Sequence, residues 1–166
     1  TRKRARFHRT PAPQVDPRQL LDVQRDAAAA TGVSTSVVEF WFEFASTYSY
    51  PASQRVEDLA RLAGVTVCWR PFLLGPIFKS QGWTDSPFNL YPAKGRYMWR
   101  DLERICESLR LPFRRPTQFP RNGLLAARLV CAVQDEPWVG ELVRRIYRAN
   151  FADDFEIADP SVLRAI

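Results

Sequence analysis

Five consecutive residues with side-chain hydroxyls, Ser46 to Tyr50, stand where a predicted strand gives way to a predicted helix. In open α/β sheets, ligands bind beyond the carboxyl ends of the strands, where the amide groups of the following helices point outward. A serine hydroxyl and free backbone N–H groups at such a point can stabilise an anion, and a thiolate is one such anion. The local sequence alone favours a structural role, in which Ser46 or Ser49 serves as the N-cap of the helix.

The number and spacing of histidines and cysteines exclude several kinds of active site. The single histidine, His8, lies in the basic N-terminal stretch, so the body of the chain lacks the histidine of a Ser-His-Asp triad, a Cys-His pair or a His-rich metal site. The three cysteines show no C-x-x-C spacing, which excludes a zinc ribbon and a dithiol redox motif. We expect no metal, and a reaction that uses a hydroxyl, a carboxylate, a cofactor or a bound thiol.

A strand–helix–strand unit is predicted around the hydroxyl cluster. The string VVEFWFEF, residues 37–44, alternates apolar and polar residues with the period of a strand. A helix that ends at Ala63 follows, with Gly64 placed for a left-handed C′ residue, and a second strand covers 65–70. Two strands joined by a helix over about 35 residues form a parallel, right-handed βαβ unit. One face of the first strand carries Val38, Phe40, Phe42 and Phe44, and the other carries Val37, Glu39, Trp41 and Glu43.

The rest of the chain is predicted to be helical. Apolar residues recur at helical spacing over 96–110, 123–133 and 137–151, and Asp159 followed by Pro160 is a helix-start signal. A short helix is also predicted over 17–30. Leu125, Trp138 and their partners at helical spacing are expected on the buried faces. Because two strands do not make a stable sheet, we expect further strands, and none is found between 72 and 166.

The net charge of +6 is concentrated near the N-terminus. Residues 1–36 hold seven basic and three acidic residues, whereas the remaining 130 hold 17 basic and 15 acidic ones. A nearly neutral body argues against a dedicated nucleic-acid surface. No run of 18 apolar residues and no signal-peptide pattern occurs, so we expect no membrane partner and a location in the cytoplasm.

Five motifs appear in order: EFASTYSY, WRPFLLGPIFK, SPFNLYPAKGRYMWRDL, LPFRRP and FPRNGLLAAR. Together they resemble the 2-hydroxychromene-2-carboxylate isomerases, relatives of the kappa-class glutathione transferases, over residues 37–163. The resemblance implies an α/β fold, a thioredoxin-like domain of the DsbA type whose βαβ unit is followed by an inserted helical domain. It divides the chain into a basic extension (1–36), the βαβ unit (37–76), the helical insertion (77–158) and the start of a return to the thioredoxin domain (159–166). Because family members continue with two strands and a helix after a cis-proline, we expect this chain to be a fragment of a longer reading frame, a natural truncation being the alternative.

The resemblance also implies a site and a cofactor. Ser46 matches the family serine that contacts the glutathione sulfur, and with the helix N-terminus it would favour the thiolate. In such isomerases the thiolate adds to the chromene ring, the ring opens, a C–C bond rotates, and elimination releases the trans isomer and recycles glutathione. Further implied glutathione contacts are Thr47, Tyr48 and Trp83, and the implied substrate contacts are Lys79, Asn89 and Lys94. Two of these residues depart from the family motif: Thr47 stands where proline is usual, and Trp83 stands where kappa transferases use asparagine.

Three functions follow as alternatives. The first is a glutathione-dependent isomerase of an aromatic-catabolism intermediate, and the second is a kappa-like transferase that uses the same thiolate. The third is a non-catalytic thioredoxin-fold binding module in which the serine is only a cap. A disulfide oxidoreductase is disfavoured because Ser46 and Ser49 occupy the positions of its two cysteines. The resemblance also implies a possible homodimer.

Overall fold

The computed structural model describes residues 36–166. The predicted helix over 17–30 lies outside the described residues. Within 36–166, two parallel strands, β1 (Val37–Phe42) and β2 (Thr66–Pro71), form the sheet, with Val37 opposite Thr66. The predicted βαβ unit and its parallel pairing are therefore confirmed, and no strand follows residue 71 within the described part.

The connection between the strands contains two helices rather than one. These are α2 (Ser49–Ser53) and α3 (Val56–Leu62), and the chain then turns at Gly64, whose φ of 67° is the left-handed geometry expected there. The first strand is shorter than predicted, ending at Phe42. Glu43 and Phe44 therefore do not continue the strand alternation, and both are buried in the turn that follows.

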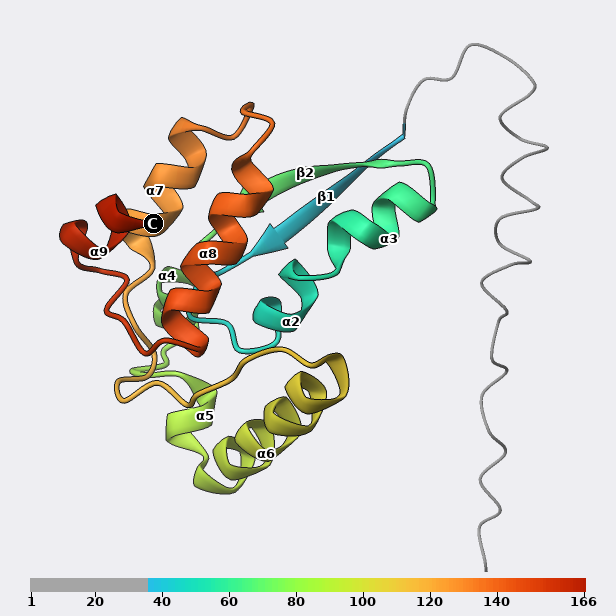
Figure 1. Cartoon of the computed structure of the whole chain (residues 1–166). Helices are drawn as coiled ribbons and strands as arrows, with labels where there is room; N and C mark the ends of the chain where they lie inside the picture. Colours follow the sequence, from blue (N-terminus) through green and yellow to red (C-terminus); the bar gives the residue numbers. More distant parts are fainter. Residues whose placement is uncertain (1–35) are drawn as a thin grey trace, which may run out of the picture. The chain divides into compact units, whose positions relative to one another are not determined.

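Six more helices follow β2, and Figure 1 shows α5 and α6 together at the bottom of the view and α7 to α9 toward the left. Helix α6 begins earlier than predicted, at Pro92, because proline suits the first turn of a helix. Helices α4 and α5 were not predicted. Asp159 caps α9 as expected, its carboxylate accepting from the Ser161 N–H at 2.7 Å. The six are α4 (Leu74–Ser80), α5 (Pro87–Leu90), α6 (Pro92–Leu109), α7 (Leu124–Ala132), α8 (Val139–Phe151) and α9 (Pro160–Ala165).

An aromatic core joins the sheet to the helices that follow it. Tyr147 of α8 packs on Phe42 and Phe44, with ring centroids 6.1 and 5.0 Å apart, and Tyr50 of α2 stacks on Phe151. The helical segment therefore shares its core with the βαβ unit. The opposite face of the sheet stays exposed, and there Glu39 pairs with Arg70 at 3.0 Å.

Two residues predicted on buried helix faces are exposed, Leu125 and Trp138. Helix α7 instead buries the small residues Ala126 and Ala127 beside Val130, which lets it approach its neighbours closely. Trp138 is the N-cap of α8 and so precedes the first turn of that helix. The helical spacing that predicted a buried Trp138 therefore does not apply to it.

Gly95 lets α6 lie directly against α5, and replacing it should destabilise the protein. A Cβ at this position would overlap the carbonyl oxygen of Phe88, a backbone atom that cannot move without displacing α5. Gly95→Ala should therefore lower the unfolding free energy by about 1–3 kcal/mol, although alanine is ordinarily the better helix former. The matched control is Gly75→Ala in α4, where a Cβ meets no atom within 4 Å. Urea unfolding of both variants checks this, and equal midpoints would contradict it.

Candidate thiol-binding site

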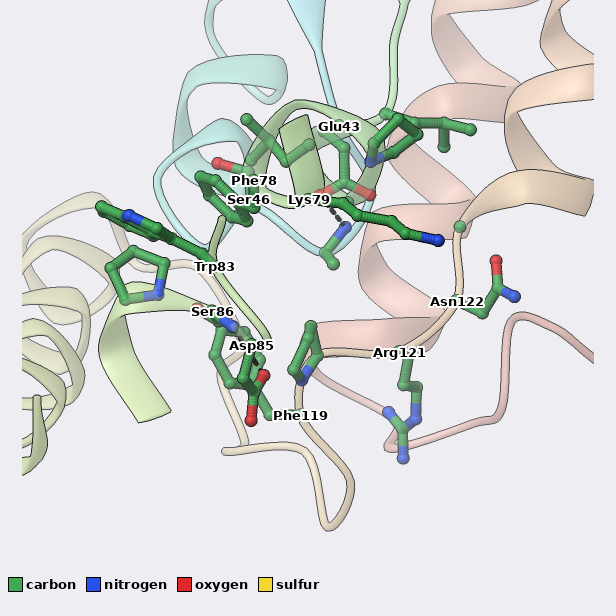
Figure 2. A pocket seen from close by; sticks show the side chains of 18 of the residues that line it. Glu43, Ser46, Phe78, Lys79, Trp83, Asp85, Ser86, Phe119, Arg121 and Asn122 are labelled. Atoms are coloured by element: carbon green, nitrogen blue, oxygen red, sulfur yellow. Dashed lines mark hydrogen bonds between the residues drawn. The ribbon is translucent and has the colours of Figure 1, made fainter. Parts of the chain in front are cut away.

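A cavity of about 710 Å³ lies at the carboxyl end of β1. Its walls come from the turn after β1, from α4, from the segment 83–88 and from the segment 119–124 (Figure 2). The volume lies within the range of about 300–1,000 Å³ that small-molecule sites occupy. The position agrees with the sequence prediction of a site beyond the strand ends.

Ser46 lines this cavity and has a free hydroxyl. Its backbone N–H donates to the carbonyl of Glu43 at 2.9 Å, while its side chain forms no hydrogen bond with any other residue of 36–166. The N-cap of α2 is Tyr48, and no side chain caps that helix. The alternative that Ser46 or Ser49 caps the helix is therefore wrong. The helix N-terminus adds little, because α2 is only five residues long and begins three residues after Ser46.

Glu43 is a cavity residue that the sequence patterning missed. Its side chain is buried, with the residue 5% exposed, and one carboxylate oxygen, Oε2, accepts from the Ala45 N–H at 3.0 Å. Burial raises the pKa of Glu43 to about 7, against the opposing effect of the N–H groups of Ala45 and Ser46. Strand alternation had placed this residue outward, and the early end of β1 is what turns it inward. A glutamate close to a suspected thiol site was the only signal that could have drawn attention to it.

Two other predicted site residues, Lys79 and Trp83, line the same cavity. Lys79 lies in the last turn of α4, and Figure 2 shows its side chain in the upper part of the site with Glu43. The Trp83 ring stacks on Phe78 of α4 with centroids 5.4 Å apart. Together they supply a cation and an apolar, flat surface.

The other four predicted site residues lie outside the cavity lining. The Tyr48 hydroxyl donates to Asp101 of α6 at 2.9 Å, and burial, with that carboxylate, raises the pKa of Tyr48 to about 12. The Thr47 hydroxyl is buried and has no partner among residues 36–166. Asn89 donates to Asp85 and to the carbonyl of Phe119, and Lys94 lies over the Phe88 ring at 5.7 Å. Asn89 and Lys94 thus contact residues that line the cavity. That Thr47, Tyr48, Asn89 and Lys94 contact a ligand stays a prediction.

Arg121 also lines the cavity, but both terminal nitrogens of its guanidinium bond to the protein, while its buried Nε has no hydrogen-bond partner among residues 36–166 and lies 3.6 Å from Glu156. Its guanidinium donates to the Asn150 carbonyl and side chain, at 3.1 and 3.0 Å, and pairs with Asp154 at 2.5 Å. In Figure 2 its side chain points away from Glu43 and Ser46. Arg121 therefore fixes the segment 119–124 against the end of α8 rather than presenting a charge to a ligand.

The donor set fits a thiol-containing ligand. The Ser46 hydroxyl, which has no hydrogen-bond partner among residues 36–166, can donate to sulfur, and Lys79 can pair with a carboxylate. No group of three His, Cys, Asp or Glu side chains suited to a metal ion occurs among residues 36–166. In the same part of the chain, every helix is too short or too polar to cross a bilayer.

Comparisons with known proteins identify the family and the fold. A family model described as a DSBA-like thioredoxin domain matches residues 37–166. The 2-hydroxychromene-2-carboxylate isomerase of Sphingobium xenophagum is 32% identical over 103 residues, which cover 61% of this chain and 52% of that protein. Glutathione S-transferase kappa 1 of Caenorhabditis elegans is 28% identical over 118 residues, covering 66% of this chain and 51% of its own length. The chain thus spans about half the length of these curated relatives.

A solved structure, of selenomethionine 2-hydroxychromene-2-carboxylate isomerase, superposes with a TM-score of 0.66 at 21% identity. The match covers 78% of this chain and 64% of that one. At this identity the likeness establishes the fold.

Proposed function

This chain belongs to the family of DsbA-like thioredoxin domains, and on that basis we propose that it binds glutathione in the cavity beside Ser46 and serves a glutathione-dependent isomerase. The observation that carries the proposal is the free hydroxyl of Ser46 at the cavity wall. The relatives named as an isomerase and as a kappa transferase support it. The proposed substrate is 2-hydroxychromene-2-carboxylate or a related aromatic-catabolism intermediate.

The residues of the cavity have distinct parts in this proposal. Ser46 donates a hydrogen bond to the sulfur, which favours the charged form of the thiol. Lys79 pairs with a carboxylate, and the stacked rings of Trp83 and Phe78 accept a flat aromatic group. Bound glutathione supplies a nucleophilic thiolate that is recovered at the end of the reaction. We also propose a cytoplasmic location, which suits the free state of Cys68, Cys106 and Cys131, and a homodimer.

Replacement of Ser46 tests the proposal. A hydrogen bond to a charged group contributes about 1.5–3 kcal/mol, so Ser46→Ala should raise the pKa of the bound glutathione thiol by about one to two units. Turnover of the hydroxychromene carboxylate near neutral pH should fall about 10- to 100-fold. The thiol pKa is measured from the ultraviolet absorbance of the thiolate as the pH of the complex is varied.

The control is Ser80→Ala at the end of α4, where the hydroxyl donates to the Ile77 carbonyl and does not line the cavity. This variant should behave as the wild type in both measurements. An unchanged thiol pKa in Ser46→Ala would contradict the role proposed for Ser46 and would favour a non-catalytic binding module. Conversion of a generic electrophile, with none of the hydroxychromene carboxylate, would favour the transferase that the kappa relatives suggest.

A further inference from the structure

Glu43 is a buried carboxylate beside Ser46 to which the proposed function gives no part. Its Oε2 accepts from the Ala45 N–H, so Oε1 is the oxygen left for another partner. A Cβ built on Gly123 would lie 3.2 Å from that Oε1, which shows that Oε1 faces Gly123. Gly123 has no side chain and itself lines the cavity, so no side chain at this position separates Oε1 from the cavity.

The groups around Glu43 leave its charge uncompensated. From α8, the Tyr147 hydroxyl donates to the backbone carbonyl of Glu43 at 2.8 Å and not to its carboxylate. Arg121 is held by Asn150 and Asp154. Lys79 of α4 lies in the same upper part of the site as Glu43 but forms no ion pair with it, and Asp85 lies lower in the view (Figure 2). The pKa of Glu43 is therefore set by burial and two backbone N–H groups, with no cation of residues 36–166 among the causes. Such a carboxylate can gain a proton near neutral pH.

We propose that the Glu43 carboxylate takes up the proton of a thiol bound at Ser46. The inference rests on the proposed function and extends it. In this step the S–H bond breaks, sulfur keeps the electron pair, and an O–H bond forms on Glu43. The pair carries one negative charge before and after the step. The proton returns to sulfur when the neutral thiol leaves.

Proton sharing of this kind suits a buried site. Two adjacent anions would repel strongly at low dielectric, whereas a thiolate beside a protonated carboxyl does not add charge. A general base is most useful when its pKa lies near the working pH, and an ordinary glutamate is too acidic for that. The Ser46 hydroxyl then stabilises the sulfur anion, and Glu43 holds the proton that the anion gave up.

Proton release on glutathione binding tests this inference without any turnover. Calorimetry at about pH 8 in buffers of different ionisation enthalpy counts the protons released, and the thiolate absorbance counts the thiolate formed. The wild type should release close to no proton per thiolate, because Glu43 retains it. Glu43→Gln should release about one. Infrared difference spectra of the wild type should gain the band of a protonated carboxyl on binding, and Glu43→Gln should not.

The matched control is Asp85→Asn, which removes a carboxylate from the same cavity, one that accepts from the Ser86 N–H. It should keep the proton count of the wild type. S-methylglutathione, which has no proton to give, should produce no infrared band. A wild type that forms the thiolate and releases about one proton, with no new carboxyl band, would overturn the role of Glu43 and leave the proposed function standing. If no glutathione binds, both fail.

Discussion

Arg121→Met should lower the unfolding free energy by about 3–5 kcal/mol, because it leaves Asp154 charged and partly enclosed without its main partner. The side chains of Arg121 and Asp154 are 3% and 8% exposed, and Arg121 Nη2 lies 2.5 Å from Asp154 Oδ1. The substitution also removes both hydrogen bonds that Nη1 of Arg121 donates to Asn150, whose own side chain donates to the Phe44 carbonyl at 2.9 Å. Urea unfolding followed by circular dichroism measures the loss.

Arg114 provides the matched control, since it reaches the same carboxylate from outside. Its guanidinium lies 3.7 Å from Asp154, and its side chain is 64% exposed. Exposed pairs contribute about 0–1 kcal/mol, so Arg114→Met should change the unfolding free energy by less than that. Similar losses for the two arginines would show that burial of the Arg121 pair does not govern its strength.

The Arg121 cluster has a pH dependence that follows from Asp154. Hydrogen bonds from the Thr117 N–H and from Arg121 lower the pKa of Asp154 in the folded protein. A lowered folded-state pKa contributes stability that is present above the unfolded pKa and is lost as the pH falls through the folded one. The segment 117–121 should therefore loosen in acid. Because that segment carries Phe119 and Arg121 into the cavity wall, the site should lose its shape together with the ion pair.

The fold was largely predictable because its signals are local. Alternation over 37–42, the glycine at 64 and the proline after Asp159 each act within a few residues, and each has the predicted structure. The features that differ from the prediction depend on tertiary contacts. Where the strand stops depends on how Phe42 and Phe44 pack against Tyr147, more than 100 positions away in the chain. The proposed domain boundaries at 76 and 158, and strands beyond residue 166, stay predictions.

The site was predictable only in part, for a related reason. Ser46, Lys79 and Trp83 were predicted from a resemblance and line one cavity. Asn89 and Lys94 come from the same region of the chain but do not line the cavity. The Asn89 side chain is hydrogen-bonded to Asp85, and the Lys94 ammonium lies over the Phe88 ring. Glu43 was missed because the predicted strand runs two residues past Phe42, and its alternation places Glu43 on the same face as the exposed Glu39 and Trp41.

Glu43 should make the folded protein less stable at pH 8 than at pH 4.5, relative to Glu43→Gln, by about 3 kcal/mol. The folded pKa of about 7 lies above the ordinary value of 4.5. A raised folded-state pKa contributes stability that is fully present below the unfolded pKa and is lost as the pH rises through the folded one. The penalty therefore develops between about pH 4.5 and pH 7 and is constant above that range.

The measurement is the difference in unfolding free energy between wild type and Glu43→Gln across this range. Subtracting the two curves removes all other titrations, including that of Asp154, and the only histidine of the chain, His8, lies far from Glu43 in sequence. A flat curve for Glu43→Gln would mean that the carboxylate ionises in the fold as it does in water. If the stability of the wild type relative to Glu43→Gln falls toward pH 7, the ionised Glu43 carboxylate destabilises the fold at the cavity wall. A functional role would explain why a destabilising group stands at this position.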